Sequence, residues 1–226
     1  MMYTHNLMKI FLDTADLDEI RAANATGLID GVTTNPTLIL RSGKTLPEVA
    51  RQLVMEFPNF ESISTEVVAD TSEEMIAQAQ QYISMGSAIT VKLPCTVEGL
   101  KAGNTLNKQG IKTNVTLIFS AAQAILAAKA GATYVSPFVG RLDDQSVAGL
   151  EVVRSISELY RMYGAETQVL SASIRSVQRA VRSWYNGAKV VTMPPKYFWE
   201  MYNHILTKDG LDKFQKDWDA ANKEHR

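Results

Sequence analysis

The chain has 226 residues, of which 46% are hydrophobic and 21% are charged, and this composition excludes an intrinsically disordered protein. Its 23 Lys and Arg residues balance 24 Asp and Glu residues without forming a basic block, which argues against nucleic acid as a partner. Because Cys95 is the single cysteine, the chain can form neither an intrachain disulfide nor a cysteine-based zinc site.

Short apolar segments alternate with segments of helical periodicity along the whole chain, and no Pro/Gly/Ser-rich linker interrupts them. The predicted strands are residues 9–13, 30–34, 62–68, 88–93, 112–118, 133–138, 168–173 and 189–193. The predicted helix starts are Asp16, Thr45 (followed by Glu48), Thr71 (followed by Glu74) and Ser120 (followed by Gln123). The predicted left-handed helix ends are Gly27, Gly86, Gly110, Gly131 and Gly187.

Eight strand–helix units of about 28 residues each predict a (β/α)8 TIM barrel, as a single domain over residues 1–226. A doubly wound open sheet is the alternative, but no G-x-G-x-x-G follows any predicted strand. Residues 208–226 follow the last unit and predict an extra C-terminal helical arm. Its apolar stripe, Leu211, Phe214, Trp218 and Ala221, needs a partner surface, either the chain's own barrel or another copy.

The amino-terminal region gives a prediction about location. It lacks the apolar stretch of a signal peptide, and no apolar run approaches the ~20 residues of a membrane helix, so we expect a cytoplasmic protein with no membrane partner. Met8 directly precedes the first strand, so residues 1–7 are expected to be a flexible extension or to follow an upstream start.

Polar residues on several strands share the face that points to the barrel axis. Ile89, Val91 and Leu93 form the apolar face of their strand, which leaves Lys92 pointing inward near the strand end. The same alternation places Glu66 near that mouth, where barrel active sites lie. By the same rule the inward positions of the other strands are Phe11, Asp13, Asn114, Thr116, Tyr134, Ser136, Phe138, Ser171, Ser173 and Arg175.

Each of these residues also has a structural interpretation. Lys92 is either a surface charge or, given its apolar neighbours, a buried and partly neutral nucleophile. Asp13 is either catalytic or a helix N-cap, a role for which Asp16 competes. Glu66 requires either a function or a tertiary ion pair, and Asn35 suits a turn before Pro36. The three histidines are too few and too terminal to predict a triad or a metal site.

Six segments in this order and spacing resemble the transaldolase family, in its short-chain branch, which also contains enzymes similar to fructose-6-phosphate aldolase. They are FLDTAD, GVTTNPTLI, VKLP-x-T-x-EGL-KA, NVTLIFSAAQ, YVSPFVGRLDD and SASIR, which begin at residues 11, 31, 91, 114, 134 and 171. The resemblance implies a Schiff-base barrel enzyme whose lysine is Lys92. It implies Asp13, Glu66 and Thr116 as acid/base and water-holding residues. The substrate-binding residues that it implies are Thr34, Asn35, Asn114, Ser136, Phe138, Arg141, Ser173 and Arg175.

This resemblance further implies sugar-phosphate substrates, no metal or organic cofactor, and a homo-oligomer, a decamer of two pentameric rings. The implied reaction transfers a dihydroxyacetone unit from sedoheptulose 7-phosphate or fructose 6-phosphate to glyceraldehyde 3-phosphate or erythrose 4-phosphate, as in the pentose phosphate pathway. The alternative is an aldolase that uses free dihydroxyacetone. Such aldolases typically carry Gln in place of Glu66 and Tyr in place of Phe138, so both positions favour a transaldolase. Ile174 departs from the commoner Phe of the motif.

Overall fold

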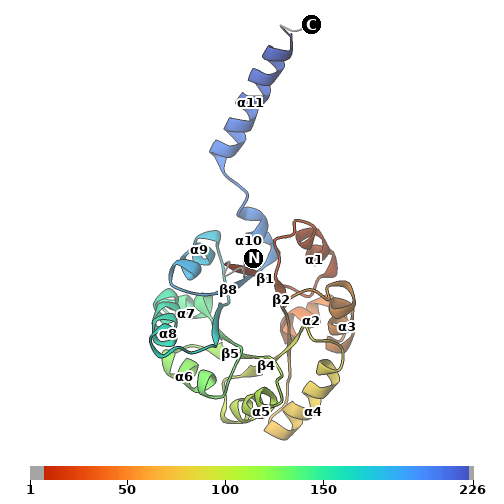
Figure 1. Cartoon of the computed structure of the whole chain (residues 1–226), viewed down its shortest axis with the longest axis vertical. Coiled ribbons are helices and arrows are strands. Elements are labelled where there is room, and N and C mark those ends of the chain that lie inside the picture. Colours follow the sequence, from red (N-terminus) through yellow and green to blue (C-terminus); the bar gives the residue numbers. More distant parts are fainter. Residues whose placement is uncertain (1–7, 224–226) are drawn as a thin grey trace, which may run out of the picture.

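The computed structural model describes residues 8–223, in which eight parallel strands form one closed barrel in chain order (Figure 1). The strands are β1 (Lys9–Asp13), β2 (Gly31–Thr33), β3 (Ser62–Glu66), β4 (Ile89–Pro94), β5 (Thr113–Ile118), β6 (Tyr134–Pro137), β7 (Gln168–Ser171) and β8 (Val190–Met193). The predicted (β/α)8 fold with an extra C-terminal helix is confirmed. The extension predicted over residues 1–7 lies outside the described residues.

Helices surround the barrel and follow its strands (Figure 1). Those before the arm are α1 (Leu17–Asn24), α2 (Pro36–Ser42), α3 (Leu46–Glu56), α4 (Ser72–Ile83), α5 (Val97–Lys108), α6 (Ala121–Lys129), α7 (Val139–Asp144), α8 (Gly149–Tyr163), α9 (Val177–Tyr185) and α10 (Pro195–Glu200). The last helix, α11 (Ile205–Lys223), forms the arm.

The predicted helix starts are confirmed by their hydrogen bonds. Asp16, Thr71 and Ser120 each accept a backbone N–H from the first turn of the following helix, and Thr45 forms a capping box with Glu48. The predicted left-handed glycines are confirmed except for one. The prediction for Gly86 is wrong, because α4 ends at Ile83 and is capped by Ser84 in a right-handed conformation.

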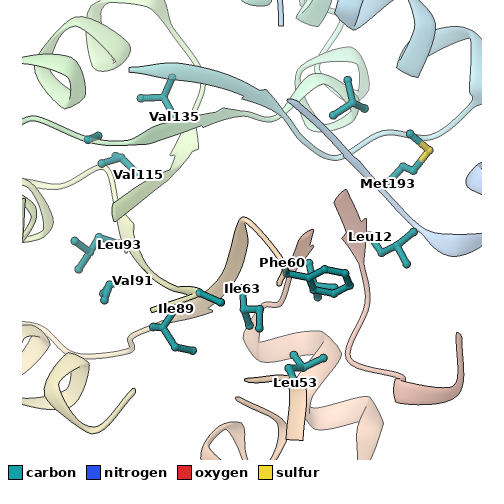
Figure 2. Close-up of a cluster of buried hydrophobic side chains, with 14 of the residues drawn as sticks. Leu12, Leu53, Phe60, Ile63, Ile89, Val91, Leu93, Val115, Val135 and Met193 are labelled. Atoms are coloured by element: carbon teal, nitrogen blue, oxygen red, sulfur yellow. The ribbon is translucent and has the colours of Figure 1, made fainter. Parts of the chain in front are cut away.

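Alternate residues of the strands point outward and pack under the helices. Figure 2 shows this layer, in which Leu12, Ile63, Val91 and Val115 come from four strands and Leu53 comes from α3. All five are fully buried. Each buried aliphatic side chain of this size contributes about 1.5–3 kcal/mol, so this continuous layer is the main source of apolar stabilisation.

Inside the barrel, an apolar layer fills the half nearer the amino ends of the strands. Phe11 and Tyr134 meet edge to face at 6.0 Å between ring centroids, and Leu170 and Val190 complete the layer. Gly31 leaves room for it, because a Cβ there would lie 2.9 Å from the Phe11 ring. The barrel is therefore a packed core at this level.

A polar cluster lies at the amino end of the barrel. The Glu61 carboxylate accepts hydrogen bonds from Lys9 Nζ and from the Tyr134 hydroxyl, both at 2.6 Å, and the Glu61 carbonyl accepts from Lys112 Nζ at 2.6 Å. With this end closed by the cluster and the aromatic layer above it, the interior opens toward the carboxyl ends of the strands.

The prediction that Ser171 points to the barrel axis is wrong. Its Oγ lies 2.8 Å from Ser183 Oγ on α9, and Leu170 points inward instead. Strand β7 ends at Ser171, and Ser173 adopts a left-handed φ of 58°. This turn breaks the two-residue alternation, which explains how Ser173 still reaches the mouth while Ser171 does not.

The arm α11 begins at Ile205, three residues before the predicted start at 208, and it projects away from the barrel (Figure 1). The apolar side chains along it, including Leu211, Phe214 and Trp218, are largely exposed. In the structure, therefore, the predicted apolar stripe does not pack on its own barrel. No helix within residues 8–223 is both long enough and apolar enough to cross a membrane.

Candidate active site

Lys92 is a buried lysine near the carboxyl end of β4. Its side chain is 6% exposed, and its Nζ lies 2.9 Å from Glu66 Oε2 and donates a hydrogen bond to the Thr34 carbonyl oxygen at 3.0 Å. Ile89, Val91 and Leu93 face the helices, as the sequence predicted. The interpretation as a surface charge is therefore wrong, and that of a buried lysine is confirmed.

Glu66 ends β3 and lies directly beside Lys92 in the strand register. The sequence left two explanations for this residue, a function or a tertiary ion pair; the ion pair is present, and the Glu66 side chain is only 16% exposed. A buried ammonium is stable only when it is paired and hydrogen-bonded, and here it has both kinds of partner. A carboxylate and an amine at 2.9 Å can also exchange a proton directly.

Asp13 ends β1 and accepts a hydrogen bond from Thr33 Oγ1 at 2.8 Å. Asp16, not Asp13, caps α1, so the structural alternative for Asp13 is wrong. Burial raises the pKa of Asp13 above its ordinary value of 3.8, while the charge of Lys92 and the hydrogen bond from Thr33 oppose that rise. Asp13 is thus a poorly hydrated carboxyl group close to a buried ammonium.

A cavity opens above these residues at the mouth of the barrel. A wide outer chamber of about 670 Å³ narrows to a deeper chamber of about 120 Å³, and Asp13, Asn35, Lys92, Phe138 and Arg141 line both. Glu66 and Thr116 line only the outer chamber. Further residues of the deeper chamber are Thr33, Ser136, Ala172, Ser173 and Thr192. The outer volume is in the range typical of small-molecule sites.

Asn114 lies below the cavity and does not line either chamber. Its Oδ1 accepts a hydrogen bond from Ser136 Oγ at 2.7 Å, and its Nδ2 donates to Ser64 Oγ at 3.3 Å. All three residues are buried. Asn114 therefore fixes Ser136 through a hydrogen bond, and Ser136 is the residue of the two that lines the cavity.

Two further predicted residues contribute backbone or capping groups. Thr34 offers its carbonyl oxygen to Lys92, while its hydroxyl donates to the Ser64 carbonyl at 2.9 Å. Asn35 caps α2, because its Oδ1 accepts from Leu38 N at 3.0 Å, and this leaves its amide Nδ2 as the group that can donate to a ligand. Asn35 is therefore a helix cap as well as a cavity residue.

The Thr116 hydroxyl is buried and has no hydrogen-bond partner within the described residues. Thr116 is one of the residues that line the outer chamber with Glu66. A buried hydroxyl without a partner costs roughly 1–3 kcal/mol, so this group is suited to bind a water molecule or a ligand oxygen.

The two predicted phosphate-binding arginines differ in their surroundings. Arg141 lines both chambers, and its guanidinium lies 4.9 Å from the centroid of the Phe138 ring. Arg175 lines neither chamber and forms a two-pronged ion pair with Asp144, with 2.6 Å between Nη2 and Oδ2. Glycine is needed at position 140, because a Cβ there would lie 2.3 Å from the Ser173 carbonyl oxygen and 2.7 Å from Arg175 Nε.

The sequence analysis missed three residues of the deeper chamber, namely Ala172 and two polar residues, Thr33 and Thr192. The alternation of the two threonines with outward-facing Val32 and Val191 could have shown that both point to the axis. At the outer chamber it also missed the cationic residues Arg41 and Lys196. Within residues 8–223, no cluster of three or more His, Cys, Asp or Glu side chains has the geometry to hold a metal ion.

Charged residues at the carboxyl-end mouth of a closed parallel barrel occupy the place where (β/α)8 enzymes have their active sites. The family described as transaldolase/fructose-6-phosphate aldolase matches residues 10–225 of the chain. The chain therefore belongs to the transaldolase/fructose-6-phosphate aldolase family.

Similar proteins agree with this assignment. A probable transaldolase of Thermoanaerobacter sp. is 48% identical over 216 residues, which cover 95% of this chain and 98% of that protein. A probable transaldolase of Paracoccus denitrificans is 49% identical over 213 residues, covering 93% and 96%. One from Methanococcus maripaludis is 48% identical over 215 residues, covering 94% and 98%.

Replacing Asp13 with Asn should stabilise the folded protein at neutral pH. Because the pKa of Asp13 is raised on folding, the native state binds its proton more tightly than the unfolded state does. The contribution of this carboxyl group to stability therefore falls as the pH rises from about 4 through its folded pKa. The variant lacks this loss, so its stability advantage over the wild type should grow across that interval and then level off.

Urea unfolding of wild type and Asp13→Asn at a series of pH values measures this difference. Asp16→Asn is the control, because Asn also caps helices and Asp16 is exposed on α1. A wild type that is more stable than Asp13→Asn at pH 7 would contradict the expected penalty of the buried carboxylate.

Proposed function

We propose that this protein is a transaldolase that moves a three-carbon dihydroxyacetone unit from a ketose phosphate to an aldose phosphate through a Schiff base on Lys92. The donor is sedoheptulose 7-phosphate or fructose 6-phosphate, and the acceptor is glyceraldehyde 3-phosphate or erythrose 4-phosphate. One observation supports this most directly: the buried Lys92 amine lies 2.9 Å from Glu66 and close to Asp13 at the end of a cavity.

Formation of the imine begins with transfer of a proton from Lys92 Nζ to Glu66. The neutral amine then attacks the C2 carbonyl carbon of the ketose, and the carbonyl oxygen takes a proton to give a carbinolamine. Loss of that hydroxyl as water leaves the protonated imine. Glu66 supplies and receives these protons through a water molecule held by Thr116, whose buried hydroxyl has no partner within residues 8–223.

Cleavage uses the protonated imine as an electron sink. Asp13 takes the proton of the C4 hydroxyl, the electron pair of the C3–C4 bond moves toward the imine, and the aldose phosphate leaves. The remaining enamine attacks the aldehyde carbon of the acceptor, and Asp13 returns its proton to the new hydroxyl. Hydrolysis of the imine then releases the product and restores Lys92.

Positioning of the three-carbon unit falls to hydrogen-bonding groups around Lys92. Ser136 and the Asn35 amide face the deeper chamber, and Asn114 orients Ser136 from below. Such groups, held by strands and by a helix cap, reduce the entropy that the bound intermediate must lose.

The terminal phosphate of the substrate binds to Arg141, with Ser173 beside it in the deeper chamber. Arg175 can bind the phosphate only after it releases Asp144. The two side chains are exposed enough for this exchange, at 51% for Arg175 and 45% for Asp144. Exposed ion pairs of this kind contribute little stability, so a bound phosphate can compete with Asp144.

Borohydride should trap Lys92 when a ketose phosphate is present. Reduction of the imine leaves a stable three-carbon adduct on Nζ, which peptide mass spectrometry locates. Lys92→Arg should remain folded but lose transfer activity by several orders of magnitude, because a guanidinium keeps the charge and cannot form the imine. Lys112, the partly buried lysine at the opposite end of the barrel, should stay unmodified. An adduct elsewhere would refute the role of Lys92.

Product formation from fructose 6-phosphate should require erythrose 4-phosphate as acceptor. Phe138 lines the cavity where the related aldolases typically carry Tyr, and its ring has no hydroxyl that could direct a proton to the carbanion, so the enamine waits for an aldehyde. A coupled assay for glyceraldehyde 3-phosphate, with and without acceptor, measures this requirement. Phe138→Tyr should raise the acceptor-independent release of dihydroxyacetone. The control is Phe119→Tyr, which adds the same hydroxyl to the ring that packs against Phe138. Steady acceptor-independent turnover by the wild type would instead identify an aldolase.

Arg141→Ala should raise the KM for phosphorylated substrates by about 10- to 100-fold and change the use of unphosphorylated glyceraldehyde much less. Arg161→Ala, at an exposed position on α8, is the matched control. Asp144→Asn releases Arg175 and should lower the same KM. Equal effects of Arg141→Ala on phosphorylated and unphosphorylated acceptors would exclude a phosphate role.

We also propose that α11 docks on another copy of this chain in a homo-oligomer, a decamer of two five-membered rings. The apolar stripe on α11 is exposed here, and an extended helix can make the heterologous contacts that close a ring. The number of subunits rests on the family resemblance.

A chain shortened by deletion from Ile205 onward should sediment as a smaller species than the full-length protein while its barrel stays folded. Light scattering and circular dichroism report the two properties. Replacing the exposed Lys213 and Lys216 with Gln leaves the stripe intact and should keep the assembly. A full-length protein that runs as a 25.0 kDa species at micromolar concentration would rule out the oligomer.

A further inference from the structure

Two threonines without a role in the proposed reaction form a hydrogen-bonded chain to Asp13. Thr33 Oγ1 donates to Asp13 Oδ1 at 2.8 Å, and Thr33 Oγ1 and Thr192 Oγ1 lie 2.7 Å apart. Both threonines are 2% exposed, and both line the deeper chamber. These hydrogen-bonded hydroxyl groups therefore lie beside the place where the substrate reacts in the proposed function.

The number of available protons decides which group donates and which accepts in each of these hydrogen bonds. An ionised carboxylate can only accept hydrogen bonds, so the single hydroxyl proton of Thr33 points to Asp13. The remaining partner of Thr33 Oγ1 is Thr192, which must then donate its own proton to Thr33. Each hydroxyl that accepts one hydrogen bond becomes a better donor in the next, so Thr192 strengthens the contact between Thr33 and Asp13.

The three residues come from neighbouring strands and not from loops. β1 pairs with β2 on one side and with β8 on the other, and Asp13 is in register with Thr33. Their side chains share the interior of the barrel, where the backbone holds them in place. A carboxylate with one oxygen held in this way keeps its second oxygen oriented toward the cavity.

We propose that Thr33 and Thr192 are positioning residues that orient the Asp13 carboxylate toward the C4 hydroxyl of the bound sugar and keep it ready to accept that proton. This inference rests on the proposed function, in which Asp13 is the base. Neither threonine needs to touch the reacting atoms to act in this way.

Several charged groups surround Asp13 and contribute to its protonation. Lys92 on β4 favours the carboxylate, whereas Glu66 on β3 and burial favour the protonated acid. Other charged groups line the outer chamber, namely Glu19 on α1, Arg41 on α2, Arg141 on α7 and Lys196 on α10. Loss of the Thr33 hydroxyl removes one group that favours the carboxylate and leaves the others unchanged, so the pKa of Asp13 rises.

The pH dependence of kcat for transfer tests this role. Thr33→Val should move the acid limb of the profile upward by about one pH unit and lower kcat about 10- to 100-fold, with less effect on KM. Thr33→Ser, which keeps the hydroxyl, should restore the wild-type limb. Thr192→Val keeps the Thr33 donor and should shift the limb in the same direction by a smaller amount.

Thr113→Val is the matched control, because the buried Thr113 hydroxyl has no hydrogen-bond partner in the described part of the chain and alternates with inward-facing Asn114 on β5. It should leave the acid limb unmoved. Thermal unfolding of each variant shows whether it is folded. If Thr33→Val does not fold, the pH profile of Thr192→Val tests the proposal instead.

Borohydride trapping separates failure of this inference from failure of the proposed function. If Thr33→Val and Thr192→Val are trapped at Lys92 but keep the wild-type acid limb, the two threonines do not position the base. If the wild type is itself not trapped at Lys92, the proposed function is wrong and the role of the threonines is refuted with it.

Discussion

The buried ammonium of Lys92 is the constraint on which the site depends. A positive charge inside a barrel loses its hydration, and the protein must replace water with fixed partners. Glu66 supplies a carboxylate from the adjacent strand β3, and the segment after β2 supplies the Thr34 carbonyl oxygen. The pairing of β3 with β4 therefore brings the two charges together, because Glu66 and Lys92 are register partners. Without Glu66 the buried charge would lose its carboxylate partner.

The interior of the barrel is arranged in levels that separate stability from chemistry. Glu61 and its partners close the amino end, and an aromatic and aliphatic layer lies above them. Hydroxyl and amide groups follow, and the charged residues lie highest, at the mouth. The apolar layer keeps water from entering from below, and Lys92 and Glu66 above it are largely buried, so hydrogen bonds and charges have larger effects on them than they would in water.

Asp13 shows that burial costs stability at the residue for which we propose the role of base. Burial disfavours its ionised form, whereas the proposed role requires that form. Lys92 and the Thr33 hydroxyl reduce this conflict without removing it. Active sites commonly retain such locally unfavourable groups, because the residues that would relieve them would not perform the chemistry.

Much of this protein was determined by local sequence. The eight strands, the helix caps at Asp16, Thr45, Thr71 and Ser120, and the inward direction of Lys92 and Glu66 follow from alternation and from capping chemistry. These rules act within a few residues, so the sequence contains all that they require. The family resemblance named the site residues, and ten of its twelve assigned residues contact the cavity or Lys92 directly.

Only the tertiary structure decided the remaining features. Ser171 faces α9 because β7 points Leu170 to the axis, and the left-handed turn at Ser173 then brings Ser173 to the mouth, which strand periodicity alone does not predict. Arg175 pairs with Asp144, 31 residues earlier in the chain, and Thr33 joins Asp13 to Thr192 across three strands. Such contacts depend on where separate segments meet, and one local pattern is compatible with many partners. Local alternation therefore indicated most of the residues that point inward, while the packing of separate segments decided which of them touch.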